Sequence, residues 1–124
     1  MKILIVDDEK LLLDLYHDIL VENGFEVIMT TNSKEGIELA KKEMPDVILL
    51  DILMPEMNGF DVAKILKSDD TMKNIPIYLL TNLPEESSSE KAKELGVSGY
   101  MMKAMTEPSK LAEEMKNIQN QSKK

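Results

Sequence analysis

Short apolar segments alternate five times with segments of helical periodicity along this chain, and this alternation restricts the fold more than any other feature. In such an order, the apolar segments are expected to form parallel strands, and the periodic segments are expected to form the right-handed crossover helices that connect them. The expected strands cover residues 3–6, 25–30, 47–50, 75–80 and 99–102.

Helices are expected after each of these strands. The first carries apolar residues at helical spacing from residue 12 to residue 20 and ends at Asn23–Gly24, because glycine is favoured just past a helix. Asn32 or Ser33 is expected to cap the second helix. The third contains residues 60–66 and is expected to follow a sharp turn at Asn58–Gly59, the fourth covers residues 84–95, and the fifth covers residues 106–118.

The strand segments are apolar at consecutive positions, which is typical of strands that are buried on both faces. This pattern predicts an α/β fold, an open, doubly wound parallel sheet with helices on both sides. In sheets of this kind, ligands bind outside the carboxyl ends of the strands, where the strand order reverses.

The 124 residues fit one domain, expected at residues 1–119, followed by a flexible tail at residues 120–124. The net charge of −8 disfavours direct binding to nucleic acid and to anionic membranes. The absence of cysteine excludes disulfides and thiolate metal sites. No apolar segment approaches the roughly 18 residues of a membrane span, and the apolar N-terminal segment is too short for a signal peptide. A cytoplasmic location is therefore expected.

Polar residues stand at the predicted carboxyl ends of four strands. Asp7 and Asp8 end the first strand, Asp51 ends the third, Thr81 ends the fourth and Lys103 ends the fifth. If the strand order is 2-1-3-4-5, the first and third strands are neighbours and these groups converge at one edge. Taken singly, the acid pair is also typical of a helix start, and a lone Asp is typical of a turn.

Three carboxylates at one edge repel one another unless a cation is present. Oxygen ligands without His or Cys favour Mg²⁺ or Mn²⁺. Asp51 is then suited to act as a nucleophile toward a phosphoryl group and to form an aspartyl phosphate. Lys103 would place a positive charge on that group, and the Thr81 hydroxyl would donate a hydrogen bond to it.

From residue 2 to about residue 118, the chain resembles the receiver domain of two-component response regulators, of the kind that includes chemotaxis regulators. The segments that carry the resemblance are ILIVDDE, DVILLDILMPEMNG, IYLLT and GYMMK, in that order. The resemblance implies a flavodoxin-like (βα)5 fold with a five-stranded parallel sheet in the order 2-1-3-4-5.

The same resemblance implies a role for each site residue. It identifies Asp51 as the phosphoacceptor, and Asp7 and Asp8 as metal-binding acids that hold Mg²⁺ or Mn²⁺ together with Asp51 and the Leu53 main-chain carbonyl. Thr81 and Lys103 correspond to the switch hydroxyl and to the lysine that contacts the phosphoryl group. Tyr100 corresponds to the aromatic residue whose rotamer follows activation.

The resemblance further implies a signalling module that catalyses only its own phosphorylation and slow dephosphorylation. The phosphoryl donor would be a sensor histidine kinase or a phosphotransfer protein. The downstream protein target would bind the face of the fourth helix, fifth strand and fifth helix, and the chain would be a monomer or weak dimer.

This sequence departs from the family pattern at four positions near the site. Ala104 replaces the usual proline after Lys103, and a cis peptide before a non-proline residue costs about 2.5–4 kcal/mol. Asn82 stands where a small residue is usual. Leu53 and Leu83 are apolar where polar side chains often assist an attacking water, so slow loss of the phosphoryl group is expected.

Two other functions remain open at this stage. One is a pseudo-receiver that binds partners without being phosphorylated. The other is a Mg²⁺-dependent phosphatase of the haloacid dehalogenase type, which requires a second Asp at the position of Leu53. Among the methionines, Met29 is expected in the core, whereas Met115 is expected either in the core or on a partner surface.

Overall fold

The computed structural model describes residues 1–81, 90, 92–102 and 108–122. One five-stranded sheet runs through these residues with the strand order β2-β1-β3-β4-β5, and every neighbouring pair is parallel, which confirms the predicted topology. The elements are β1 (Lys2–Val6), α1 (Lys10–Glu22), β2 (Glu26–Thr30), α2 (Ser33–Glu43), β3 (Val47–Asp51), α3 (Gly59–Ser68), β4 (Ile77–Thr81), β5 (Gly99–Met102) and α5 (Pro108–Ser122).

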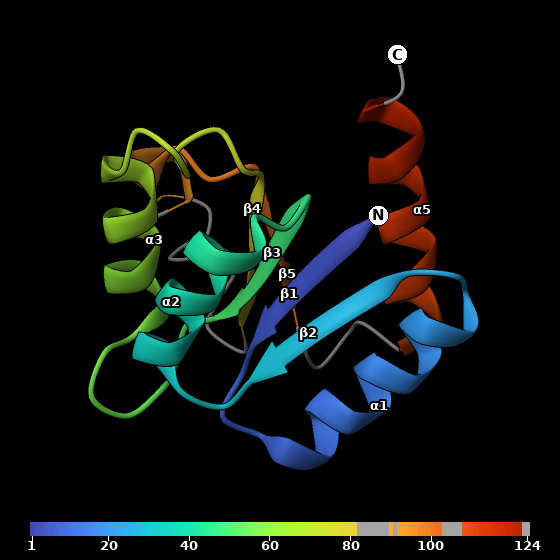
Figure 1. The fold of residues 1–124 in the computed structure, drawn as a ribbon. Helices are drawn as coiled ribbons and strands as arrows, with labels where there is room; N and C mark the ends of the chain where they lie inside the picture. Colours follow the sequence, from blue (N-terminus) through green and yellow to red (C-terminus); the bar gives the residue numbers. More distant parts are fainter. Residues whose placement is uncertain (82–89, 91, 103–107, 123–124) are drawn as a thin grey trace.

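The helices form a layer on each face of the sheet, with α2 and α3 on one side and α1 and α5 on the other (Figure 1). Each layer encloses its own apolar cluster. The α2–α3 side buries residues such as Leu50 and Val62, whereas the α1–α5 side buries residues such as Leu49 and Leu111. Leu49 and Leu50 are adjacent, so alternate residues of β3 fill opposite clusters, as burial on both faces requires.

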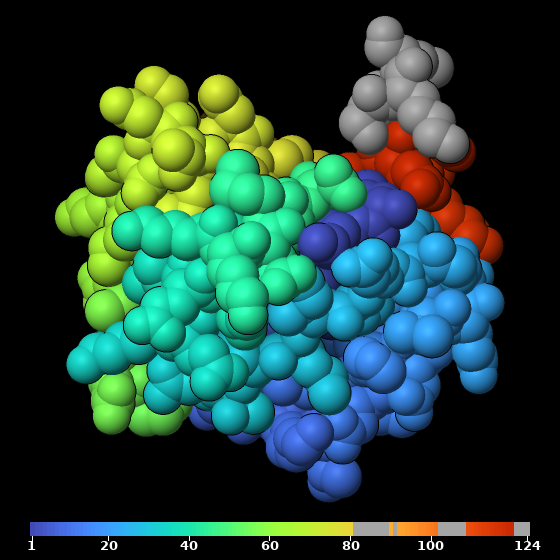
Figure 2. All heavy atoms as spheres, in the orientation of Figure 1, coloured from blue at the N-terminus to red at the C-terminus, as the bar shows by residue number. Residues whose placement is uncertain are grey.

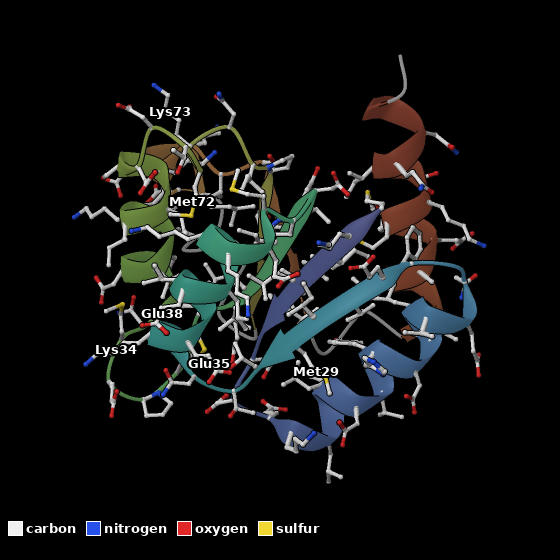
Figure 3. All side chains as sticks on the ribbon, viewed as in Figure 1. Met29, Lys34, Glu35, Glu38, Met72 and Lys73 are labelled. Atoms are coloured by element: carbon white, nitrogen blue, oxygen red, sulfur yellow. The ribbon has the colours of Figure 1, made fainter. Side chains whose placement is uncertain are left out.

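Side chains of α2 and β2 lie at the centre of the face that the space-filling view presents, with α1 beside them (Figure 2). Met29 lies between β2 and α1 and packs against the α1–α5 cluster, as expected (Figure 3). Met115 is fully buried in the same cluster, so it belongs to the core and not to a partner surface. Within the described residues, no helix combines the length and apolarity that crossing a membrane requires.

The helix starts follow from local side-chain chemistry. Asn32 caps α2, because its side chain accepts a hydrogen bond from the Glu35 N–H at 2.9 Å. Asn58 caps α3 in the same way, accepting from the Asp61 N–H at 2.9 Å. The segment at residues 58–59, expected as a sharp turn, is therefore a helix start.

Several predicted boundaries differ from those observed. The fourth strand begins at Ile77 instead of at residue 75, because Pro76 has no N–H for the ladder, although its carbonyl accepts from the Ile48 N–H at 3.0 Å. The last helix continues to Ser122, past the predicted end at Ile118, because neither Gly nor Pro interrupts it. Of the predicted fourth helix, residues 90 and 92–95 are helical, and residues 84–89 and 91 lie outside the described part of the chain.

Candidate functional site

The candidate site lies at the carboxyl ends of β1 and β3, which are neighbours in the sheet. Val6 pairs with Leu50, so the next residues, Asp7 and Asp51, come side by side at this edge. The Asp7 N–H donates to the Thr30 carbonyl at 3.2 Å and continues the ladder with β2 for one more residue. Backbone pairing of Asp7 with β2, and of the preceding Val6 with β3, therefore fixes the position of Asp7.

Asp7, Asp8 and Asp51 form one cluster of carboxylates. One oxygen from each side chain lies within 4.8 Å of one oxygen from each of the other two. Asp7 is fully buried and Asp51 is only 3% exposed, whereas Asp8 is exposed at the rim. The cluster thus has two acids in the interior and one that faces solvent.

Such an arrangement costs free energy in two ways, because burial removes hydration from the charges and proximity makes them repel each other. A divalent cation offsets both effects. Mg²⁺ binds oxygen ligands at about 2.1 Å, so the three oxygens, which lie within 4.8 Å of one another, would have to move closer together around a shared ion. All-oxygen donors also suit Mg²⁺ or Mn²⁺ better than softer metals.

Asp7 has a second role in the start of α1. Its Oδ1 accepts a hydrogen bond from the Glu9 N–H at 2.9 Å, while Glu9, the residue that precedes the helix, makes no capping bond with its own side chain. The interpretation of the acid pair as a helix start therefore holds for Asp7, and the same side chain also belongs to the acid cluster.

The loop that follows Asp51 returns to β3 at Gly59. The Gly59 N–H donates to the Ile52 carbonyl at 2.8 Å. A Cβ atom at Gly59 would lie 2.8 Å from the Ile52 Cα and would also overlap the Asp51 carbonyl oxygen. Only glycine therefore allows this close approach, which holds the main chain at Asp51. Leu53, within this loop, is 58% exposed.

The other predicted site residues are described only in part. Thr81 is the last residue of β4, and the preceding residue, Leu80, pairs with Asp51, so the Thr81 main chain lies one step beyond Asp51 along the sheet edge. Tyr100 lies in β5 and packs, half-buried, against the α2–α3 cluster. The Thr81 side chain and Lys103 lie outside the described residues, as do Asn82, Leu83, Ala104 and Met105.

Sequence reasoning missed two residues near the site. It took Gly59 as part of a turn, although a glycine at the first position of a helix is itself a signal of close backbone approach. It considered Ser33 only as a helix cap, whereas the Ser33 hydroxyl is buried and donates to the Met57 carbonyl in the loop after Asp51. No sequence pattern indicates that second contact, because the two residues are distant along the chain.

Comparisons of the sequence with known proteins identify the family. The family model described as response regulator receiver domain matches residues 3–116. Among curated relatives, the polar-differentiation response regulator DivK of Brucella anthropi is 35% identical over 106 residues, which cover 86% of each chain.

Solved structures give the same result for the fold. The chemotaxis protein CheY4 of Vibrio cholerae matches with a TM-score of 0.86 at 28% identity, over 94% of this chain and 96% of that one. A CheY-like receiver domain protein of Methanospirillum hungatei matches with a TM-score of 0.88 at 26% identity, over 98% of this chain and 95% of that one. These likenesses confirm the predicted flavodoxin-like fold.

Proposed function

Because the chain belongs to the response regulator receiver domain family, we propose that Asp51 accepts a phosphoryl group from a phosphohistidine. The donor is a sensor histidine kinase or a phosphotransfer protein. The observation that carries this proposal is the buried Asp51 carboxylate at the end of β3, with Asp7 and Asp8 beside it. A carboxylate in that setting needs a cation, and it is suited to attack phosphorus once the cation is bound.

In the proposed transfer, an Asp51 carboxylate oxygen forms a bond to phosphorus while the phosphorus–nitrogen bond of the phosphohistidine breaks. The electron pair of that bond returns to the imidazole nitrogen, which takes up a proton from solvent. With acetyl phosphate as donor, the phosphorus–oxygen bond breaks instead and acetate leaves. The products are an aspartyl phosphate and the free donor, and no oxidant or further reactant is needed.

Mg²⁺ or Mn²⁺ is the proposed metal, and Asp7, Asp8 and Asp51 would hold it together with the Leu53 main-chain carbonyl. Bound there, the ion would offset the negative charge of the acids and of the transferring phosphoryl oxygens. The support is the chemistry of the donor set, which consists of oxygens alone and brings three carboxylates together.

Thr81 and Lys103 are proposed to contact the phosphoryl group, with Thr81 and Tyr100 forming the switch. Phosphorylation would bias two conformations of the face made by the fourth helix, β5 and α5, and a few kcal/mol of differential interaction is enough to shift such a population. That face would bind the downstream protein target. The module would act on no substrate besides itself, in the cytoplasm, as a monomer or weak dimer.

Incubation with acetyl phosphate and MgCl₂, followed by intact mass measurement, tests the proposal. A persistent gain of one phosphoryl group that needs Mg²⁺ and is absent from Asp51→Asn is expected. No gain in mass would favour a pseudo-receiver that only binds partners. Continuous release of inorganic phosphate without a phosphorylated protein would favour a phosphatase, although the required Asp is replaced by Leu53.

A further inference from the structure

The Ser33 side chain joins α2 to the loop that follows Asp51. Ser33 is the first residue of α2 and is only 4% exposed, whereas the next side chain, Lys34, extends away from the molecule (Figure 3). The Ser33 Oγ donates to the Met57 carbonyl at 2.7 Å and lies 3.6 Å from the Met54 Sδ. The contact spans 24 residues of sequence, so it fixes two separate segments relative to each other.

The capping of α2 does not depend on this hydroxyl. Asn32 supplies the capping bond, accepting from the Glu35 N–H at 2.9 Å. The Ser33 hydroxyl is therefore directed to the loop and not to its own helix. Removing it would leave the helix cap in place, which separates the two roles experimentally.

The loop that Ser33 contacts has an unfavourable backbone conformation. Glu56 has a φ of +67°, in the left-handed region that non-glycine residues rarely adopt. The Met57 N–H donates to the Pro55 carbonyl at 2.8 Å, so the chain reverses in a three-residue γ-turn centred on Glu56. A turn of this kind persists only when its surroundings hold it, and the Ser33–Met57 bond is one such restraint from outside the loop.

Resting on the proposed function, we infer that Ser33 is a positioning residue for the metal site. By holding Met57, it holds the loop between Asp51 and Gly59, within which Leu53 offers its main-chain carbonyl to the ion. The Gly59 contact with Ile52 fixes one end of this loop, and the Ser33 bond fixes its turn. The inference concerns Mg²⁺ affinity, which a purely structural contact would leave unchanged.

Titration of the metal-free protein with MgCl₂ by calorimetry tests the inference directly. Ser33→Ala removes the donor, and we expect its dissociation constant for Mg²⁺ to rise about threefold to tenfold, as the loss of one net hydrogen bond predicts. Ser33→Cys keeps a weaker donor, so its dissociation constant for Mg²⁺ is expected to lie between those of the unchanged protein and Ser33→Ala. The matched control is Ser68→Ala, because the Ser68 Oγ also donates to a main-chain carbonyl at 2.7 Å, that of Lys64, at the far end of α3.

A second readout uses the rate of phosphorylation by acetyl phosphate. For Ser33→Ala, we expect a reduced rate at limiting Mg²⁺ that recovers at saturating Mg²⁺, while Ser68→Ala matches the unchanged protein at both concentrations. A general folding defect would lower the rate at both. If Ser33→Ala does not fold, Ser33→Cys provides the test, because it keeps the volume of the side chain and has only a weak donor.

Unchanged Mg²⁺ affinity in Ser33→Ala, beside normal Mg²⁺ binding and phosphorylation of the unchanged protein, would overturn this inference and leave the proposed function standing. Failure of the unchanged protein to bind Mg²⁺ would instead overturn the proposed function, and this inference with it. The two failures are therefore distinguishable in one series of titrations.

Discussion

At the scale of single residues, two positions near Asp51 lead to predictions, a glycine packed against the Asp51 main chain and a leucine exposed in the loop that follows Asp51. Gly59 lets α3 begin against the main chain of Asp51 and Ile52, where any Cβ would overlap backbone atoms. Leu53 is exposed in the loop between them. Gly59 is expected to affect the stability of the fold, and Leu53 is expected to affect the lifetime of the proposed aspartyl phosphate.

Gly59→Ala is expected to destabilise the fold by about 1–3 kcal/mol, the usual cost of overpacking. Gly36→Ala is the comparison, because the three atoms nearest to a Cβ there are Val6 side-chain carbons, the closest at 2.8 Å, and none of them is a backbone atom. Urea unfolding followed by circular dichroism measures the free energy of unfolding of both variants. An equal or larger loss of stability for Gly36→Ala would contradict the assignment of Gly59 as the backbone contact.

Leu53→Gln is expected to shorten the lifetime of the aspartyl phosphate by at least about tenfold, because a polar side chain can orient an attacking water. The leucine side chain is 58% exposed, so the change leaves the core intact, and the main-chain carbonyl remains available to a metal. Leu53→Met serves as the apolar control. Decay of the phosphorylated mass over time gives the rates, and equal lifetimes for the Gln variant and the unchanged protein would exclude this role.

At the scale of elements, helix ends illustrate how far local sequence rules apply. After α1, Gly24 takes a φ of +88°, as glycine does past many helices. The residue that ends α2, Met44, takes a φ of +44° without being a glycine. The sequence predicts the end of α1 from Asn23–Gly24, but it does not predict the left-handed conformation of Met44, because such positions are usually occupied by glycine or asparagine.

Met44→Gly is expected to stabilise the protein by about 0.5–1 kcal/mol, because glycine adopts the left-handed conformation without the steric cost of a Cβ. Met44 is 49% exposed, so little packing is lost. Met44→Ala keeps the Cβ and is expected to give no such gain. Urea unfolding measures the free energy of unfolding of the two variants. Equal values for Met44→Gly and Met44→Ala would show that the φ angle of Met44 does not destabilise the protein.

Strands and the site also differ in how far the sequence alone predicts them. The centres of the strands are predictable because β3 and its neighbours are continuously apolar, whereas the start of β4 depends on how Pro76 fits the ladder. The meeting of Asp7 with Asp51 is predictable because topology alone brings adjacent parallel strands to one edge. The hydrogen bond from Ser33 to the loop after Asp51 is not predictable, because it depends on tertiary packing between segments that are distant in sequence.

At the scale of the whole molecule, the acid cluster is expected to link metal binding to stability. In EDTA, Asp8→Asn is expected to raise the free energy of unfolding by up to about 1 kcal/mol, because it removes one of three repelling charges at an exposed position. MgCl₂ is expected to stabilise the unchanged protein by mass action and this variant less.

Glu22→Gln is the control for that comparison, since it removes one negative charge at the far end of α1. Its response to MgCl₂ should equal that of the unchanged protein. Thermal unfolding with EDTA and with MgCl₂ gives the stabilisation by Mg²⁺ of the unchanged protein, Asp8→Asn and Glu22→Gln. Equal Mg²⁺ stabilisation of Asp8→Asn and of the unchanged protein would contradict a role for Asp8 as a metal ligand.

The most direct measurement is the location of the phosphoryl group after reaction with acetyl phosphate and MgCl₂, by reduction of the acyl phosphate with borohydride and peptide mass analysis. We predict a single modified position, Asp51, and no modification in the presence of EDTA. Modification at another carboxylate, or none at all under conditions where Mg²⁺ binds, would contradict the assignment of Asp51 as the phosphoacceptor.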